Sequence, residues 1–184
     1  MKLLKNRGVA IAITAIVVFA AVLFGVNRSL NKLANNIERM FYEGVYIEDG
    51  KYTQPSIHSK LEQCGDQALG ISTIITNHPQ FVNDADALIL LRRELIAAES
   101  IEAKSKAFDE LSEAVNRASK ALADADLPQD DIASAADYIT RFNSAKEFIT
   151  SAAYNDEASE RWNKRSYIAR FFDLLIQARV PETF

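Results

Sequence analysis

The sequence of 184 residues contains little cysteine, glycine or proline. Its single cysteine, Cys64, excludes an internal disulfide and is compatible with either an oxidising or a reducing compartment. Six glycines and four prolines are few for this length, whereas Ala, Leu, Ile, Glu, Lys and Ser are abundant. This composition is typical of a helical protein with few turns and one soluble domain.

Residues that carry common chemistry are also scarce. His58 and His78 have no further His or Cys at the spacing of metal ligands. The sequence has no glycine-rich phosphate loop, no GxSxG turn and no HExxH helix. Acidic pairs such as Asp84 with Asp86 lack the glycine and the final glutamate of an EF-hand loop. We therefore predict no catalytic residue, no metal site and no cofactor, and we expect that the protein is not an enzyme.

One long apolar run is present, at residues 9–26, and it contains no charged residue. At about 1.5 Å of rise per residue, a helix of this length spans about 27 Å, close to the thickness of the bilayer hydrocarbon core. A cleaved secretory signal peptide is the alternative, but its apolar core is usually about 7 to 15 residues long. We therefore predict a single-pass transmembrane helix that holds the protein in a cell membrane.

Charges near this run bear on orientation and on partners. Three basic residues lie close together before it and three are spread more widely after it: Lys2, Lys5, Arg7, Arg28, Lys32 and Arg39. The positive-inside rule then favours a cytoplasmic N-terminus and an extracytoplasmic soluble domain. Beyond the run the chain has 18 basic and 25 acidic residues, a net charge of −7. This acidic balance argues against nucleic acid or anionic lipid as a partner.

Apolar residues recur at spacings of three and four after Pro55, as in an amphipathic helix. The clearest stripe predicts a helix over about 57–77: Ile57, Leu61, Cys64, Ala68, Ile71 and Ile75. Ser59 with Glu62 has capping-box spacing. Gly65 and Gly70 within this helix mark either a close approach to a neighbouring helix or simply tolerated small residues.

The following segment, 84–123, contains no Gly or Pro and keeps the same spacing, with a short step near Ala98. We predict one helix of about 60 Å with a local overwinding. Residues 124–131 form a turn in which Asp130 or Asp131 caps the next helix, whose stripe runs from Ile132 to Ala152.

Upstream of Pro55 the helical spacing extends over residues 29–44, so the membrane helix is expected to continue beyond the bilayer. Residues 45–53 fit either a small hairpin or an extended link, and we favour the link because an isolated hairpin is marginally stable. The predicted fold is all-α, with an antiparallel bundle of three to four long helices after the transmembrane helix. The predicted segments are a basic tail, the transmembrane helix, a stalk with linker, and the bundle: 1–8, 9–26, 27–55 and 56–184.

An aromatic group near the C-terminus predicts a last helix of about twenty residues that ends near Pro181. Its adjacent pairs Phe171-Phe172 and Leu174-Leu175 exceed what one helix face can bury, so part of this surface is expected to meet another chain or the bilayer. The predicted contact residues are Trp162, Tyr167, Phe172 and Leu174. Basic residues nearby also fit a helix that lies on the membrane surface, although burial in the bundle is favoured.

The layout resembles that of LemA proteins, which are membrane-anchored helical proteins of bacteria. The likeness rests on the single span, the long helices, residues 141–145 (RFNSA) and the closing residues 180–184 (VPETF). The family has Arg-Tyr-Asn-x-Ala where this chain has Phe142, and its Asp-Leu-Ile-Pro-Asn-Leu stretch is absent here. The resemblance implies a membrane-anchored bundle and supplies no catalytic residue.

Together these features predict a scaffold or accessory protein of the cell envelope that binds an unknown protein or a second copy of itself. Nucleic acid is not expected as a partner, and the bilayer is contacted through residues 9–26. The alternative is an extracytoplasmic sensor domain that binds a small ligand between its helices. The lack of a second span or a signalling domain argues against that alternative.

Overall fold

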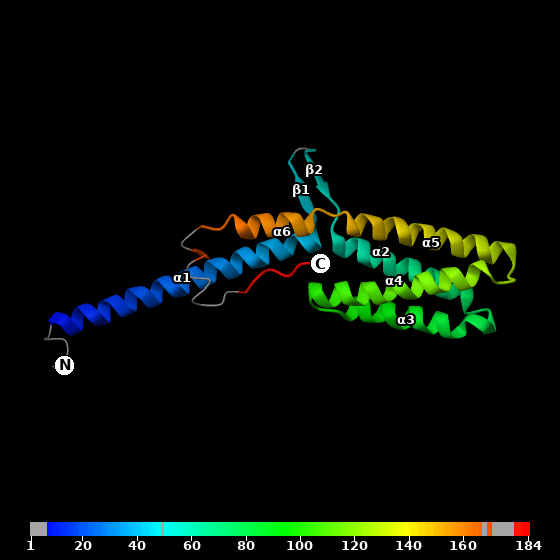
Figure 1. Ribbon diagram of the computed structural model, residues 1–184, viewed down its shortest axis with the longest axis horizontal. Coiled ribbons are helices and arrows are strands. Elements are labelled where there is room, and N and C mark those ends of the chain that lie inside the picture. The colour runs from blue at the N-terminus through cyan, green and yellow to red at the C-terminus, as the bar shows by residue number, and fades with distance from the viewer. Residues whose placement is uncertain (1–6, 49, 167–168, 171–178) are drawn as a thin grey trace. The chain divides into compact units, whose positions relative to one another are not determined.

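The computed structural model describes residues 7–48, 50–166, 169–170 and 179–184 (Figure 1). The fold is all-α apart from one short hairpin, as the sequence predicts. The described elements are, in chain order, α1 (Arg7–Glu43), β1 (Val45–Ile47), β2 (Tyr52–Gln54), α2 (Ile57–Ile75), the 3-10 turn η2 (Pro79–Phe81), α3 (Val82–Ala97), α4 (Ile101–Ala123), α5 (Gln129–Thr150) and α6 (Tyr154–Asn163).

The chain divides into two compact units that do not follow sequence order. We call Met1–Glu38 with Ala158–Pro181 the α1 unit, and Arg39–Glu157 with Glu182–Phe184 the bundle unit. α1 is continuous from the apolar run to Glu43, so the predicted helical continuation beyond the run is confirmed.

In the bundle unit, α2 packs closely against α3 and α5, and α3 packs against α4. Short connections join these four helices, as expected for antiparallel neighbours. All six residues of the predicted α2 stripe are buried. The core also takes in residues from the other three helices: Leu88, Leu95, Phe108, Leu111, Val115, Phe142, Ala145 and Ile149.

The start of α2 differs from the predicted capping box. Ser56 is the N-cap residue, and its hydroxyl oxygen accepts a hydrogen bond from the backbone N–H of Ser59 at 3.1 Å. A Cβ atom on Gly70 would lie 2.4 Å from the ring of Tyr138 on α5. Gly70 therefore permits the close approach of α2 to α5, whereas a Cβ on Gly65 would make only an ordinary contact at 3.4 Å with Arg92.

The single helix predicted over 84–123 is wrong, because the chain breaks at residues 98–100 into α3 and α4. Ala98 is extended, with ψ of 125°, and Ser100 caps α4 by accepting a hydrogen bond from the N–H of Ala103 at 3.0 Å. The apolar spacing continues across this break because α3 and α4 fold back on each other and use their stripes in one core.

The extended link predicted for residues 45–53 is also wrong, because β1 and β2 form an antiparallel hairpin. This hairpin is not isolated: Val45 is buried, and the side-chain oxygen of Gln54 accepts a hydrogen bond from the N–H of Ala153 at 3.1 Å. Gly44 makes the turn out of α1 at φ +94°, where a Cβ would lie 2.2 Å from the carbonyl oxygen of Gln54.

The last two helices differ from prediction in their ends. Pro128 occupies the N-cap of α5 without a side-chain hydrogen bond, so neither Asp130 nor Asp131 is the cap; both lie in the first helical turn. α6 ends at Asn163, before most of the residues over which the C-terminal helix of about twenty residues is predicted. Most of the remaining predicted helix lies outside the described residues.

Candidate functional site

The apolar half of α1 is the first candidate surface. Among the described residues, α1 is the one helix long and apolar enough to cross a membrane, judged by length and composition. Its large side chains are exposed along the run, including Ile11 at 69% and Phe24 at 70%. The hydroxyl of Thr14 donates a hydrogen bond to the carbonyl oxygen of Ala10 at 3.0 Å, so this polar group is satisfied within the helix. Such a surface is suited to a lipid environment.

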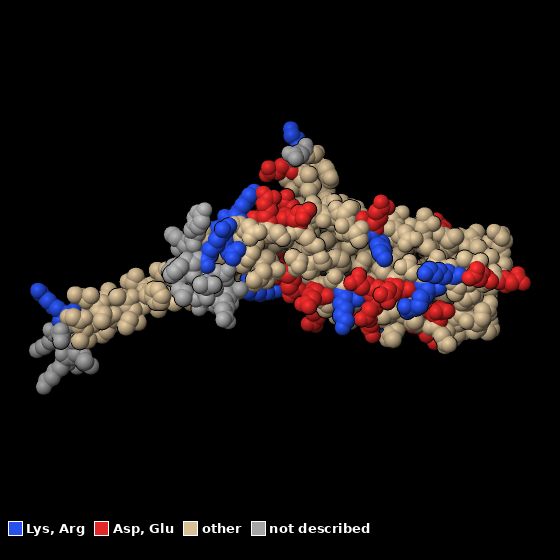
Figure 2. All heavy atoms as spheres, in the orientation of Figure 1, with Lys and Arg blue, Asp and Glu red and all other residues tan. Residues whose placement is uncertain are grey.

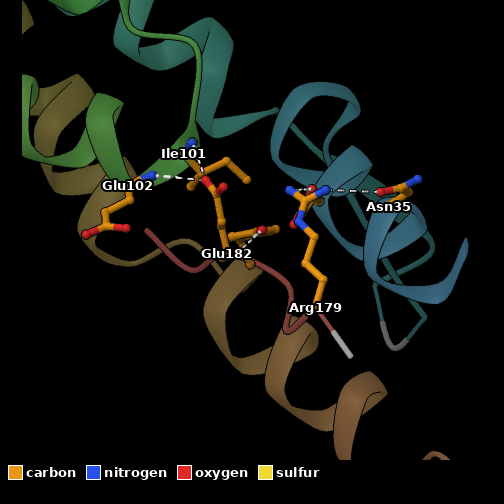
Figure 3. A network of polar contacts seen from close by, with 7 residues as sticks. Asn35, Ile101, Glu102, Arg179 and Glu182 are labelled. Atoms are coloured by element: carbon orange, nitrogen blue, oxygen red, sulfur yellow. Dashed lines mark hydrogen bonds and ion pairs between the residues drawn. The ribbon is translucent and has the colours of Figure 1, made fainter. Parts of the chain in front are cut away.

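The C-terminal residues 182–184 belong to the bundle unit, and Glu182 contacts the start of α4 (Figure 3). One carboxylate oxygen of Glu182 accepts hydrogen bonds from the backbone N–H groups of Ile101 at 2.7 Å and Glu102 at 3.3 Å. Ser100 satisfies the next N–H, so the whole first turn of α4 is capped. A negative charge here also interacts favourably with the helix dipole.

Aromatic side chains hold the same C-terminal residues. The ring of Phe184 lies 5.7 Å from that of Phe41 and 6.1 Å from that of Phe108, measured between centroids. Asn155 pairs with the backbone of Phe184 in both directions, accepting from its N–H at 2.9 Å and donating to its carbonyl at 2.6 Å. The hydroxyl of Tyr154 donates to the carbonyl of Glu182 at 2.6 Å. These contacts hold the half-buried residues Glu182 and Phe184 against the bundle unit, a placement for which the local sequence gave no signal.

The predicted contact residues fall in the α1 unit. Trp162 is 7% exposed, and the guanidinium of Arg165 lies 4.5 Å from its ring centroid. Trp162 is therefore part of the interior of this unit, with little surface left for a partner. The other three predicted contacts, Tyr167, Phe172 and Leu174, lie outside the described residues.

The hairpin offers an exposed surface that sequence reasoning missed. Tyr46 and Tyr52 are each 53% exposed. Tyr46 pairs with Thr53 and Tyr52 pairs with Ile47, so the two tyrosines lie on opposite faces of the ribbon. In the described part of the chain the sheet has two strands only, which leaves one edge of each strand unpaired. Alternation of Tyr and polar residues around the turn was the available sequence signal.

A groove opens between α4 and α5, which touch each other at few positions. It has a volume of about 280 Å³ and an apolar lining with two hydroxyls: Ser119, Leu122, Ala123, Ile132, Ala135, Ala136, Ile139 and Thr140. Thr140 donates its hydroxyl to the carbonyl of Ala136 at 2.8 Å. The groove is therefore suited to a small, mainly apolar molecule.

Three titratable side chains of the bundle unit are buried or paired with another residue. Burial raises the pKa of the Cys64 thiol to about 12, so the thiol stays neutral and behaves as a small apolar group. Lys104 is 6% exposed and lines a small cavity with His58 and Glu62; burial lowers the pKa of its ammonium. His78 contacts Asp131 at 3.0 Å. Within the described residues no three His, Cys, Asp or Glu side chains gather as metal ligands would.

Comparison with known proteins adds no assignment, because no family model, curated protein or solved structure matches this chain.

Proposed function

We propose that this protein is a membrane-anchored scaffold or accessory protein of the bacterial cell envelope that acts by binding another protein. The continuous helix α1 supports this, since one element carries both an apolar span and residues of the helical core. The resemblance to LemA proteins agrees with the proposal. The buried thiol of Cys64 and the scattered histidines favour a binding role over an enzymatic one.

The observation that carries the proposal is the hairpin of β1 and β2. Its unpaired strand edges provide backbone N–H and carbonyl groups with which an extended segment of a partner pairs. Tyr46 and Tyr52 flank those edges, and tyrosine provides large contact area at low cost in side-chain entropy. The partner is therefore expected to contribute a β-strand.

Affinity purification of the full chain from detergent-solubilised membranes tests this role. The unchanged chain is expected to retain a stoichiometric protein, and a photoreactive residue at position 46 is expected to crosslink to it. The double variant Tyr46→Ser with Tyr52→Ser should lower the recovery of that protein about tenfold or more. Val82→Ser with Leu90→Ser removes two exposed apolar side chains from α3 and serves as the matched control. Equal recovery with all three chains would reject the hairpin as the binding surface.

A second candidate function is suggested by the groove between α4 and α5, which fits an extracytoplasmic sensor of small ligands. Native mass spectrometry of the purified chain would then show a bound small molecule in place of a protein. Ala136→Phe is designed to fill the groove and should abolish that bound mass. A retained small molecule in this variant would exclude the groove as its site.

The orientation of the bundle unit belongs to the proposal as well. Lys2, Lys5 and Arg7 favour a cytoplasmic N-terminus and an outward bundle. Protease added to intact spheroplasts is then expected to digest the chain after Asn27. Full protection of the chain, with digestion after lysis, would instead place the bundle in the cytoplasm.

A further inference from the structure

Charge is divided unequally between the two compact units. Ten basic and three acidic residues belong to the α1 unit, a net charge of +7. Eleven basic and 22 acidic residues belong to the bundle unit, a net charge of −11. The whole-chain net charge of −4 is therefore the sum of two opposite net charges, which the sequence argument from the overall acidic balance did not separate. Figure 2 shows the acidic side chains spread along the visible face of the bundle.

Part of the positive charge lies directly after the apolar run. Arg28 and Lys32 follow the end of the run by two and six residues, about 3 and 9 Å along a helix. Both residues are exposed. A bilayer of about 40–45 Å with a hydrocarbon core of about 30 Å has a headgroup zone of about 5–8 Å on each side, so Arg28 lies within this zone and Lys32 lies near its outer limit.

Of the other eight basic residues of this unit, Lys2, Lys5 and Arg7 precede the run, and five belong to α6 and the residues after it. α6 begins where the ring of Tyr154 lies 5.7 Å from that of Phe41, near the end of α1. Its later residues belong to the same compact unit as the earlier part of α1, so α6 runs antiparallel to α1 (Figure 1). α6 therefore runs back along α1 towards the apolar run (Figure 1).

Burial fixes which side chains of this unit face outward. Its buried residues include three on α1 and two on α6: Leu30, Ala34, Ile37, Ala158 and Trp162. Arg161, Lys164 and Arg170 are exposed. Lys164 pairs with Glu160, and Arg170 donates to the carbonyl of Asn163. These local contacts leave an excess of positive charge, because residues 28–38 and 158–181 together contain seven basic and three acidic residues.

We propose that Arg28, Lys32, Arg161, Lys164 and Arg170 form a surface that binds the headgroups of anionic phospholipids in the leaflet from which α1 emerges. Each basic side chain near an anionic surface strengthens binding by roughly fivefold, within a screening length of about 8–10 Å. The α6 residues are distant in sequence from the span, so they do not enter the positive-inside count. The surface is separate from the hairpin, and either proposal can fail without the other.

Lipid retention by the full chain tests this proposal. The protein is reconstituted in vesicles of phosphatidylcholine with phosphatidylglycerol, extracted in mild detergent, and its bound lipids are counted by native mass spectrometry. The unchanged chain is expected to be enriched in phosphatidylglycerol. Two variants should each lower that enrichment about tenfold or more. The α6 variant combines Arg161→Gln, Lys164→Gln and Arg170→Gln. The α1 variant combines Arg28→Gln and Lys32→Gln.

The matched control removes the same charge from the bundle unit, with Lys60→Gln, Lys106→Gln and Arg117→Gln. It should keep the enrichment, and circular dichroism should show unchanged helicity in every variant. Equal enrichment in all chains, or equal loss in the control, would overturn the proposal. Loss of an acidic protein partner in the α6 variant, with unchanged lipid retention, would overturn it as well and assign the surface to protein binding.

Discussion

The carboxylate of Glu182 lies 2.7 Å from the backbone nitrogen of Ile101, a residue 81 positions earlier in the chain. Two distant parts of the sequence are thus joined at the start of α4. The contact makes the last three residues a structural part of the bundle unit, because their removal would leave N–H groups of α4 without a protein acceptor.

Glu182→Ala is expected to lower the free energy of unfolding by about 1–2 kcal/mol, since capping interactions and charge at a helix N-terminus contribute this much. Glu182→Gln should cost less, because the amide oxygen still accepts hydrogen bonds. Thermal unfolding followed by circular dichroism checks both values. Thr183→Ala is the control, since Thr183 is exposed, and a loss as large as that of Glu182→Ala would refute the capping role.

Leu111→Asp is expected to unfold the bundle unit. Leu111 is fully buried on α4, and an unpaired buried carboxylate costs several kcal/mol against a total stability of about 5–15 kcal/mol. Glu110→Gln, at the exposed neighbouring position, should change stability by less than about 0.5 kcal/mol. Chemical denaturation of both variants measures the difference. Native stability in Leu111→Asp would show that the inner face of α4 is wrongly assigned.

Lys104→Met is expected to raise the free energy of unfolding by about 1 kcal/mol, because it removes a buried charge and keeps the apolar stem. Lys104 is 6% exposed, and its ammonium is only 3.5 Å from its acceptor, the carbonyl oxygen of Leu95. This is a long hydrogen bond for a charged donor.

The stability difference between Lys104→Met and the unchanged chain is expected to depend on pH. Burial lowers the pKa of Lys104 below its ordinary value of 10.5 in the folded protein, so the unfolded protein binds more protons at alkaline pH. The cost of burying the charge is therefore present at neutral pH and falls as pH rises through the folded pKa. In urea titrations, the stability advantage of Lys104→Met should therefore decrease as the pH is raised from neutral through the folded pKa towards 10.5. A constant advantage would mean that charge is not the cause.

Local periodicity predicted much of the fold. The α2 stripe was correct because apolar spacing reports directly which face of a helix is buried, and each helix keeps that spacing. The break at Ala98–Ser100 was missed for the same reason: the spacing continues through it, and no Gly or Pro marks it. The extended link was wrongly favoured over the hairpin because the hairpin is supported by the hydrogen bond between Gln54 and Ala153, a contact that no local pattern encodes.

The candidate surfaces were harder to predict than the helices. Trp162 was expected to be a contact residue, but an aromatic at helical spacing does not reveal whether its face has a neighbour. Charge separation was hidden in the net charge, because residues of the α1 unit come from both ends of the chain. Only the fold shows that Arg28 and Arg161 belong to one unit.

The central claim is that residues 9–26 remain in the protein and hold it in a membrane. Carbonate extraction of membranes, followed by intact-mass measurement of the extracted chain, tests it most directly. We predict that the full chain stays in the membrane pellet with its first 26 residues present, whereas a chain lacking residues 1–27 is found in the soluble fraction. Release of the intact chain by carbonate would contradict the claim. A mass that shows cleavage after the apolar run would contradict it as well.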